Sequence, residues 1–394
     1  MSKISTYLWP GKVHLGFGSA NLAAQEVALL GEKSVFVIVD PGVRQAGLLD
    51  GVLDGLQAAD IQVTVYDQVV PNPDMASVHA AANALRDAKS DVLIGMGGGS
   101  ALDTAKAVKL LVGGPPSAAI DEYATALGDE KRPYPAPQDM PPYIAIPTTA
   151  GTGAEATPWA VITRNDNQMK FGVGDVSTIP EVALVDPELT LTLPPHLTAA
   201  TGMDALSHLI EAYVSTNNNP ILDPLILHGI GLIGRSLRTA VSRGDNKQAR
   251  HDMMEASLLG GVAISSNWLG ACHSLAHPLS GLAGVHHGLA CGIMLPYQMA
   301  YSLMGALERY ADIALALDDV WTGDESVREM AFGAVTAVSD LLNDTNLPTT
   351  LIDAGVSPDL LPQLAKAAYA DLNWWTNPRE VSEQAMAEMY RAAM

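Results

Sequence analysis

Cysteine is scarce in this chain: Cys272 and Cys291 are its two cysteines among 394 residues. A disulfide framework in a chain of this size needs many more, and the N-terminus shows no basic segment followed by an apolar signal core. No apolar run reaches the roughly 18 residues that a membrane-spanning helix needs. We therefore expect a protein of the reducing cytoplasm rather than a secreted or membrane protein.

Basic residues are also few, with 22 Lys and Arg against 43 Asp and Glu and a formal net charge of −21. Nucleic-acid binding draws most of its strength from clustered Lys and Arg, so we expect no nucleic-acid partner. Hydrophobic residues, in contrast, make up 48% of the chain, which is enough for a large buried core. A chain of this length is predicted to form two domains.

The pattern of apolar residues changes halfway along the chain. Short β-branched runs at 34–39, 61–66, 91–96 and 143–147 predict strands of a parallel sheet, and a helical pattern at 75–89 lies between two of them. From about Pro195 onward, apolar residues recur at helical spacing without an alternating strand. We predict an α/β domain over 1–190 and an all-helical domain over 191–394. Residues 112–142, rich in Pro and Gly, are predicted to be a surface loop with one helical turn.

A glycine-rich turn follows the strand predicted at 91–96. It contains Gly97, Gly98 and Gly99, and it leads through Ser100 into a helix that carries Asp103. Glycines let the backbone approach a pyrophosphate closely, and the free N–H groups of a helix start favour its charge. The spacing is neither G-x-G-x-x-G nor a P-loop, and a purely structural turn capped by Ser100 is the alternative interpretation.

A second polar turn follows the strand at 143–147 and holds Thr148, Thr149 and Thr152, whose hydroxyls suit a phosphate or a ribose. Open α/β sheets bind ligands at the ends of neighbouring strands, so the two turns support each other. Asp40 ends the strand at 34–39, where a carboxylate can bind an adenosine ribose and repel a 2′-phosphate, which favours NAD over NADP. The alternative for Asp40 is a plain Asp-Pro-Gly turn residue.

Histidines cluster in the second half of the chain. Asp204 and His208 stand four apart on one face of a predicted helix, and His273 and His277 repeat this spacing. His286 and His287 come next to a glycine that can open a new helix. A carboxylate among several imidazoles and small apolar residues is costly unless a cation holds them together. Three imidazoles and one carboxylate suit ferrous iron or zinc, and a fifth position would let the ion act on a substrate oxygen as a Lewis acid.

Five motifs together resemble one family, the iron-containing (group III) alcohol dehydrogenases of the dehydroquinate-synthase-like superfamily. They are GMGGGSALDTAK, IPTTAGTGAEAT, VDPELTLTLP, TGMDALSHLIEAY and the stretch from HSLAHPLSG to HHGLACGIMLP, in the family's order and spacing. The resemblance runs through nearly the whole chain. It implies a Rossmann-like dinucleotide-binding N-terminal domain, an all-α metal-binding C-terminal domain and catalysis in the cleft between them.

The resemblance also implies an activity: hydride transfer between NAD(H) and a small primary alcohol, diol or aldehyde. Carried over by motif, the ligands of iron, with zinc as the alternative, are Asp204, His208, His273 and His287. His277 resembles a further active-site histidine that transfers a proton between the reacting oxygen and solvent. The resemblance also implies a homodimer or larger homo-oligomer.

The cofactor residues are carried over in the same way. Asp40 would lie beside the adenosine ribose, Asn72 of PNPD near the cofactor, and Lys170 would reach the cofactor from a strand, although a solvated strand lysine is the alternative. The remaining residues implied at the cofactor are Gly97, Gly98, Gly99, Ser100, Asp103, Thr148, Thr149 and Thr152. Three tryptophans are expected either to wall the substrate pocket or to belong to the core, namely Trp268, Trp374 and Trp375.

Three other functions are alternatives to this activity. A maleylacetate-reductase-like or hydroxy-acid oxidoreductase of the same superfamily is disfavoured because maleylacetate reductases do not present the full Asp/His set. A dehydroquinate-synthase-like lyase needs a basic cluster for its anionic substrate, which this acidic chain does not show. A non-catalytic nucleotide- or metal-binding protein would have no use for the relay residue His277.

Overall fold

The computed structural model describes residues 6–124, 132–166, 169–317 and 323–394, which divide into two compact units. The α/β unit consists of Trp9–Thr149 and Gly153–Thr190. The helical unit consists of Ala150–Thr152 and Leu191–Met394, together with the segment before Trp9. Within the described ranges, no helix has the length and apolar character needed to cross a bilayer.

A six-stranded, fully parallel sheet forms the centre of the α/β unit, with the order β1-β8-β5-β4-β2-β3. Its strands are β1 (Lys12–Leu15), β2 (Ser34–Val39), β3 (Gln62–Tyr66), β4 (Val92–Gly97), β5 (Tyr143–Pro147) and β8 (Val182–Val185). A separate antiparallel pair is formed by β6 (Ala160–Thr163) and β7 (Lys170–Val173). The strand order reverses between β2 and β4, where open α/β sheets bind their ligands.

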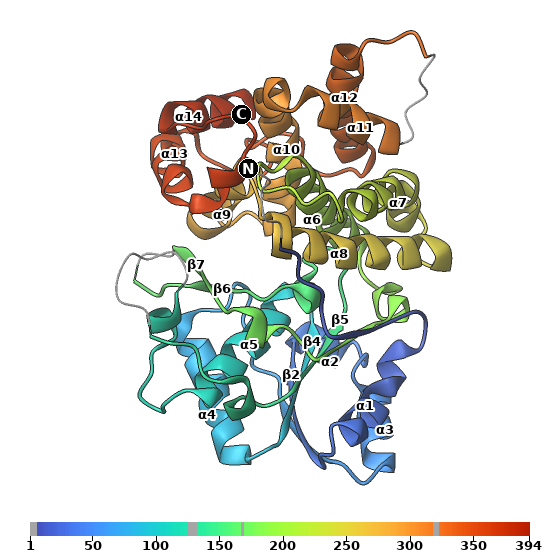
Figure 1. The fold of residues 1–394 in the computed structure, drawn as a ribbon, viewed down its shortest axis with the longest axis vertical. Helices are drawn as coiled ribbons and strands as arrows, with labels where there is room; N and C mark the ends of the chain where they lie inside the picture. The colour runs from blue at the N-terminus through green and yellow to red at the C-terminus, as the bar shows by residue number, and fades with distance from the viewer. Residues whose placement is uncertain (1–5, 125–131, 167–168, 318–322) are drawn as a thin grey trace. The chain divides into compact units, whose positions relative to one another are not determined.

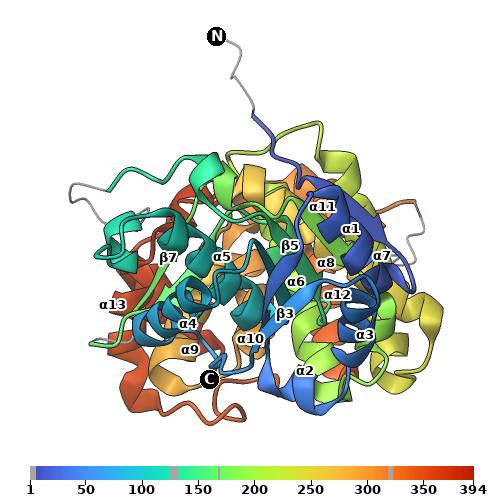
Figure 2. The same cartoon turned by 90° about the horizontal axis from the view of Figure 1, so that it is seen from below.

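Helices cover both faces of this sheet (Figure 2). Along β2, Phe36 and Ile38 belong to the core with α4 (Met75–Ala88) and α5 (Gly99–Gly113). Val35, Val37 and Val39 belong to the core with α1 (Ala23–Leu29) and α3 (Asp50–Ala58). Alternate side chains of a strand point to opposite faces, so a strand covered on both sides is apolar throughout. This is why the sequence shows continuous β-branched runs here.

The helical unit contains no strand among residues 191–317 and 323–394, and its helices appear in green to red in Figure 1. They are α6 (Pro195–Val214), α7 (Asp223–Ser242), α8 (Lys247–Asn267), α9 (Ala271–Ala283), α10 (His287–Ser302), α11 (Leu307–Ala316), α12 (Val327–Asp344), α13 (Leu361–Ala370) and α14 (Glu383–Ala392). Every residue of α6 from Thr198 to Val214 is buried, because α7, α8 and α10 pack around it. Polar residues on α6 therefore face the interior.

The predicted fold class is confirmed, whereas two details of the prediction are wrong. The short strands β1 and β8 were not predicted. The segment 112–142 is not a simple surface loop, because its described part contains two 3-10 turns and buries Ile120, Tyr123 and Met140 in the core beside α5. Residues 125–131 of this segment lie outside the described residues.

Candidate functional site

Three helices of the helical unit supply the four predicted metal ligands. Asp204 and His208 lie one turn apart on α6, His273 lies on the first turn of α9, and His287 is the first residue of α10. The close approach of α10 to α6 depends on Gly288, since a Cβ there would lie 2.3 Å from the backbone oxygen of Ala200.

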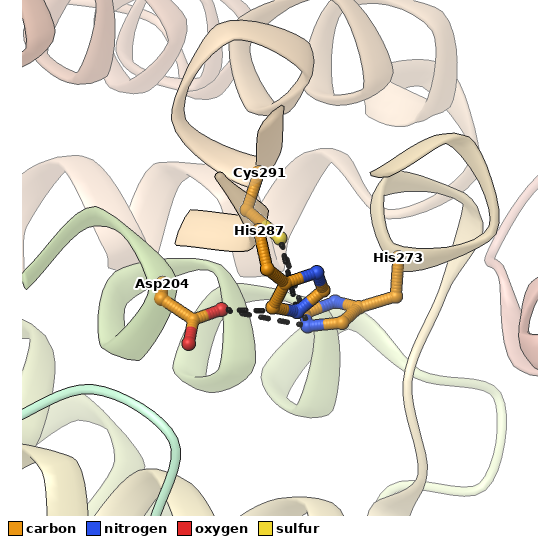
Figure 3. A group of neighbouring side chains, drawn as sticks. All are labelled: Asp204, His273, His287 and Cys291. Carbon is orange, nitrogen blue, oxygen red and sulfur yellow. Dashed lines mark hydrogen bonds and ion pairs between the residues drawn. The ribbon is translucent and has the colours of Figure 1, made fainter. Parts of the chain in front are cut away.

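One carboxylate oxygen lies at the centre of this group. Asp204 Oδ1 is 3.8 Å from His208 Nε2, 3.8 Å from His273 Nε2 and 3.6 Å from His287 Nε2. Figure 3 shows Asp204 and two of these imidazoles pointing toward one another. Each of the three predicted imidazoles therefore has a nitrogen within 3.8 Å of Asp204, but the donor atoms that all lie within 4.8 Å of one another include those of His273 and His287 and not that of His208.

The donor set fits a divalent cation. Asp204 Oδ1 is buried and accepts no hydrogen bond from the described residues, although a carboxylate oxygen is costly to bury unpaired. Iron or zinc binds such oxygen and nitrogen atoms at about 2.1 Å, which places neighbouring ligand atoms roughly 3.0–3.4 Å apart. The observed distances of 3.6–3.8 Å between Asp204 Oδ1 and the three imidazole nitrogens are slightly longer than a bound ion requires. We call Asp204, His208, His273 and His287 together the ligand cage.

Backbone and carboxylate groups orient the imidazoles. His208 Nδ1 donates to the carbonyl of Gly151 at 3.2 Å, and burial lowers the pKa of His208 to about 4. His273 Nδ1 donates to Glu211 Oε2 at 2.5 Å, while Glu211 Oε1 accepts the backbone N–H of Cys272 at 2.6 Å. A donating Nδ1 leaves the lone pair on Nε2, so both rings turn their basic nitrogen toward Asp204.

Cys291 is a neighbour of the predicted ligands that the sequence did not reveal. It lies one turn after His287 on α10, and its Sγ is 3.7 Å from His287 Nε2 and 3.8 Å from His273 Nε2. One ligand atom from each of Asp204, His273, His287 and Cys291 lies within 4.8 Å of the others. The structure thus offers a thiol as a further donor.

His277, the predicted relay residue, lies one turn after His273 on α9 and next to the cage. Its ring stacks on His287 with centroids 5.4 Å apart. Its Nδ1 lies 2.6 Å from Asp371 Oδ2, a contact that the sequence did not reveal. Burial alone would raise the pKa of Asp371, but His277 and the hydrogen bonds from Asn373 hold it below its usual value.

The predicted cofactor residues of the α/β unit gather at the carboxyl ends of β2, β4 and β5. Gly97 pairs with Pro147, the N–H of Asp40 bonds to the carbonyl of Met96, and the N–H of Thr148 bonds to the carbonyl of Gly97. Gly97 has a φ of +151° and lies so close to Asp40 that a Cβ at Gly97 would be 3.2 Å from the Asp40 Cβ.

The same edge holds the remaining glycines, Ser100 and Asn72. A Cβ at Gly98 would lie 3.4 Å from the Thr149 side chain, Gly99 begins α5, and Ser100 Oγ accepts the N–H of Asn72 at 3.3 Å. The N–H groups that begin α5 therefore lie among the predicted residues, as phosphate binding requires.

Two predicted cofactor residues also have structural partners. Asp40 Oδ1 caps α2 (Pro41–Gln45) by accepting the N–H of Gly42 at 2.7 Å. Asp103 Oδ2 accepts the N–H of Val161 at 3.0 Å and so ties β6 to α5, and Asp103 Oδ1 lies 3.6 Å from the buried Lys106 ammonium. Burial raises the pKa of Asp103 above its usual value, while Lys106 and, more weakly, Lys170 at the start of β7 act in the opposite direction.

Thr152 and the three tryptophans lie in the helical unit. Thr152 belongs to Ala150–Thr152, the part of the second polar turn that is grouped with the helical unit. Trp268 and Trp375 are exposed by 52% and 69%, which excludes the core alternative for both. Trp374 stacks on Tyr369 with ring centroids 5.2 Å apart.

Family comparisons are consistent with this geometry. Residues 10–187 match the model of the iron-containing alcohol dehydrogenases, and residues 198–394 match the C-terminal model of the Fe-containing alcohol dehydrogenase family. The choline dehydrogenase of Bacillus subtilis is 35% identical over 99% of this chain and 95% of its own length.

Two solved structures share the fold. A 1,3-propanediol oxidoreductase superimposes with a TM-score of 0.93 at 36% identity over the full length of both chains. The sulfoacetaldehyde reductase of Bifidobacterium kashiwanohense, solved in complex with NAD+, superimposes with a TM-score of 0.86 at 30% identity, covering 100% of this chain and 99% of its own. The predicted resemblance is confirmed: the chain belongs to the iron-containing alcohol dehydrogenase family and is an oxidoreductase that acts on alcohols or aldehydes.

Proposed function

We propose that this enzyme transfers a hydride between a small primary alcohol or diol and NAD, with a divalent metal ion, iron or zinc, held by Asp204, His208, His273 and His287. The observation that carries the proposal is the buried, unpartnered Asp204 oxygen facing three imidazole nitrogens. When bound, the ion supplies Lewis acidity toward the substrate oxygen.

A side chain of the protein would accept the proton that the alcohol releases on oxidation. Oxidation of an alcohol by NAD+ gives an aldehyde, NADH and one proton, and the proton must leave a largely buried region. His277 is the candidate acceptor, because its ring lies against the ligand cage and its side chain remains 13% exposed. It would take the hydroxyl proton and pass it to solvent.

NAD binding is proposed at the edge formed by β2, β4 and β5. Gly97, Gly98, Gly99 and Ser100 open α5, so the N–H groups there would face the diphosphate. The cap contact of Asp40 uses Oδ1 and leaves Oδ2 for other partners, whereas both oxygens of Asp103 already face Val161 and Lys106. The other residues proposed to line the cofactor are Asn72, Thr148, Thr149, Thr152 and Lys170. The NAD+ complex of the sulfoacetaldehyde reductase supports this choice of cofactor.

The substrate is proposed by analogy with the 1,3-propanediol oxidoreductase. The names of the three relatives refer to a cationic, a neutral and an anionic substrate, so family membership alone does not select one. A neutral primary alcohol or short diol is the class that we would test first.

The cytoplasm is the proposed location and a homodimer or larger homo-oligomer the proposed assembly. The location is supported by two buried, unpaired cysteines, as a reducing compartment favours, and the assembly rests on family resemblance.

The direct test is a spectrophotometric screen of primary alcohols and diols with NAD+, and of aldehydes with NADH, after separate reconstitution with Fe2+ and Zn2+. We expect metal-dependent NADH formation, which Asp204→Ala abolishes together with metal binding. Full metal occupancy in Asp204→Ala, or equal rates with and without metal, would refute the assignment.

A further inference from the structure

A partly buried carboxylate outside the predicted site contacts the relay histidine. Asp371 follows α13 and caps the 3-10 helix η9 (Leu372–Thr376), 94 residues away in sequence from His277 on α9. Asp371 Oδ2 lies 2.6 Å from His277 Nδ1, and the two side chains are 16% and 13% exposed. This is the distance of a charge-assisted hydrogen bond.

The position of Asp371 is fixed by several donors. Its Oδ1 accepts the N–H and the side-chain amide of Asn373 at 3.0 and 2.7 Å, and the hydroxyl of Ser274 at 3.2 Å. The Ser274 hydroxyl also contacts the carbonyl of Asp371 at 3.0 Å and accepts the N–H of Trp374 at 3.0 Å. These hydrogen bonds to Oδ1 hold the carboxylate in an orientation in which Oδ2 faces His277.

From this geometry we propose that Asp371 is a positioning residue for the reaction: by accepting the Nδ1 proton, it fixes the orientation and the tautomer of His277. An ionised carboxylate accepts but does not donate, so Nδ1 carries the proton and the lone pair is on Nε2. The inference rests on the proposed function in one respect, because it makes Nε2 the atom that receives the alcohol proton. The alcohol would lose its O–H proton to Nε2 and its C–H hydride to NAD+, which would give the aldehyde and NADH, and Nε2 would then release the proton to solvent.

The informative variant is Asp371→Asn, which keeps the size of the side chain and an oxygen that can cap η9. Its amide would donate to Nδ1 and move the histidine proton to Nε2, the wrong atom for accepting a proton. We expect kcat to fall about 100-fold or more, within the range of general acid–base contributions, with a smaller change in KM. Metal content should equal that of the wild type.

A matched control is Asp175→Asn, since Asp175 also caps a 3-10 helix, η5 (Val176–Thr178), through a carboxylate oxygen. A double-mutant cycle separates positioning from a structural role: Asp371→Asn should have no further effect on kcat in a His277→Ala background. Two independent losses that multiply in the double variant would overturn the proposal.

A readout that does not depend on turnover distinguishes this proposal from the proposed function. Nitrogen-15 NMR of histidine-labelled, zinc-loaded protein should show His277 with its proton on Nδ1 in the wild type and on Nε2 in Asp371→Asn. An Nε2 proton in the wild type would refute the positioning role even in an active enzyme. An Nδ1 proton in a protein that oxidises no alcohol would refute the proposed function and leave the geometry intact.

Discussion

Glu211 offers the sharpest test of the metal centre, because both of its oxygens are used by its neighbours. One accepts the N–H of Cys272 at 2.6 Å and the other accepts His273 Nδ1 at 2.5 Å, and the side chain is fully buried. Glu211→Gln replaces one acceptor by a donor at nearly constant volume. If the amide faces His273, the ring proton moves to Nε2, where it blocks metal binding; if the amide faces Cys272, two N–H groups oppose each other.

Either outcome lowers the affinity of the site for the metal ion. Loss of such an outer carboxylate costs about 10- to 100-fold in metal affinity, or roughly 1.4–2.7 kcal/mol. The assay is competition for Zn2+ against a chromophoric chelator, with Glu255→Gln as the control because Glu255 contacts His228 and no predicted ligand. An affinity of Glu211→Gln equal to that of the wild type would refute the view that this carboxylate orients His273.

Three further predictions follow from the same structure. Asp40→Gly should raise kcat/KM for NADP relative to NAD, and an unchanged ratio would mean that Asp40 only caps its helix. Burial raises the pKa of Glu155 to about 7 from the ordinary value of 4.5, so its contribution to stability is present below pH 4.5 and is lost as the pH rises through 7. Glu155→Gln should therefore unfold several degrees above the wild type at pH 8, a difference of about 3 kcal/mol, and that advantage should shrink toward pH 5 in thermal scans. The Gly151 carbonyl directs His208 Nε2 toward Asp204, so elemental analysis should find that His208→Ala loses the metal and that Cys291→Ala retains it. The reverse result would place the Cys291 thiol in the ligand set.

The central strands and the Asp204–His208 pair share a property that made them predictable: their signals are local. Val35, Val37 and Val39 alternate with Phe36 and Ile38 in one buried strand, and Asp204 and His208 share one helix face. Periodicity reveals both features without knowledge of the fold. The strands β1 and β8 have four residues each and are stabilised by pairing with each other and, for β8, with β5. Periodicity over so few residues does not separate a strand from a helix, even in the apolar run VALV of β8.

The residues that orient the histidines were not predicted because they act over long distances in sequence. Glu211 is 62 residues from His273, and Asp371 is 94 residues from His277. One signal for Glu211 was present, since it lies three residues after His208 in a helix and therefore near the same helix face. Asp371 stands in a polar segment beside two tryptophans, where nothing in the sequence distinguishes it from an ordinary cap.

The orienting contacts also bear on the charge of the metal centre. Asp204, Glu211 and Asp371 place three carboxylates around imidazoles whose Nδ1 atoms are already used as donors, and His208 donates to a neutral carbonyl. Without a cation, these negative charges lie in a poorly solvated interior, which is costly. A divalent ion offsets two of the three charges, so binding should stabilise the folded enzyme, by about 2.7 kcal/mol when the free ion is at 100 times its Kd. Chelation should therefore lower the thermal midpoint of the wild type and leave that of Asp204→Ala, which has already lost the ion, unchanged.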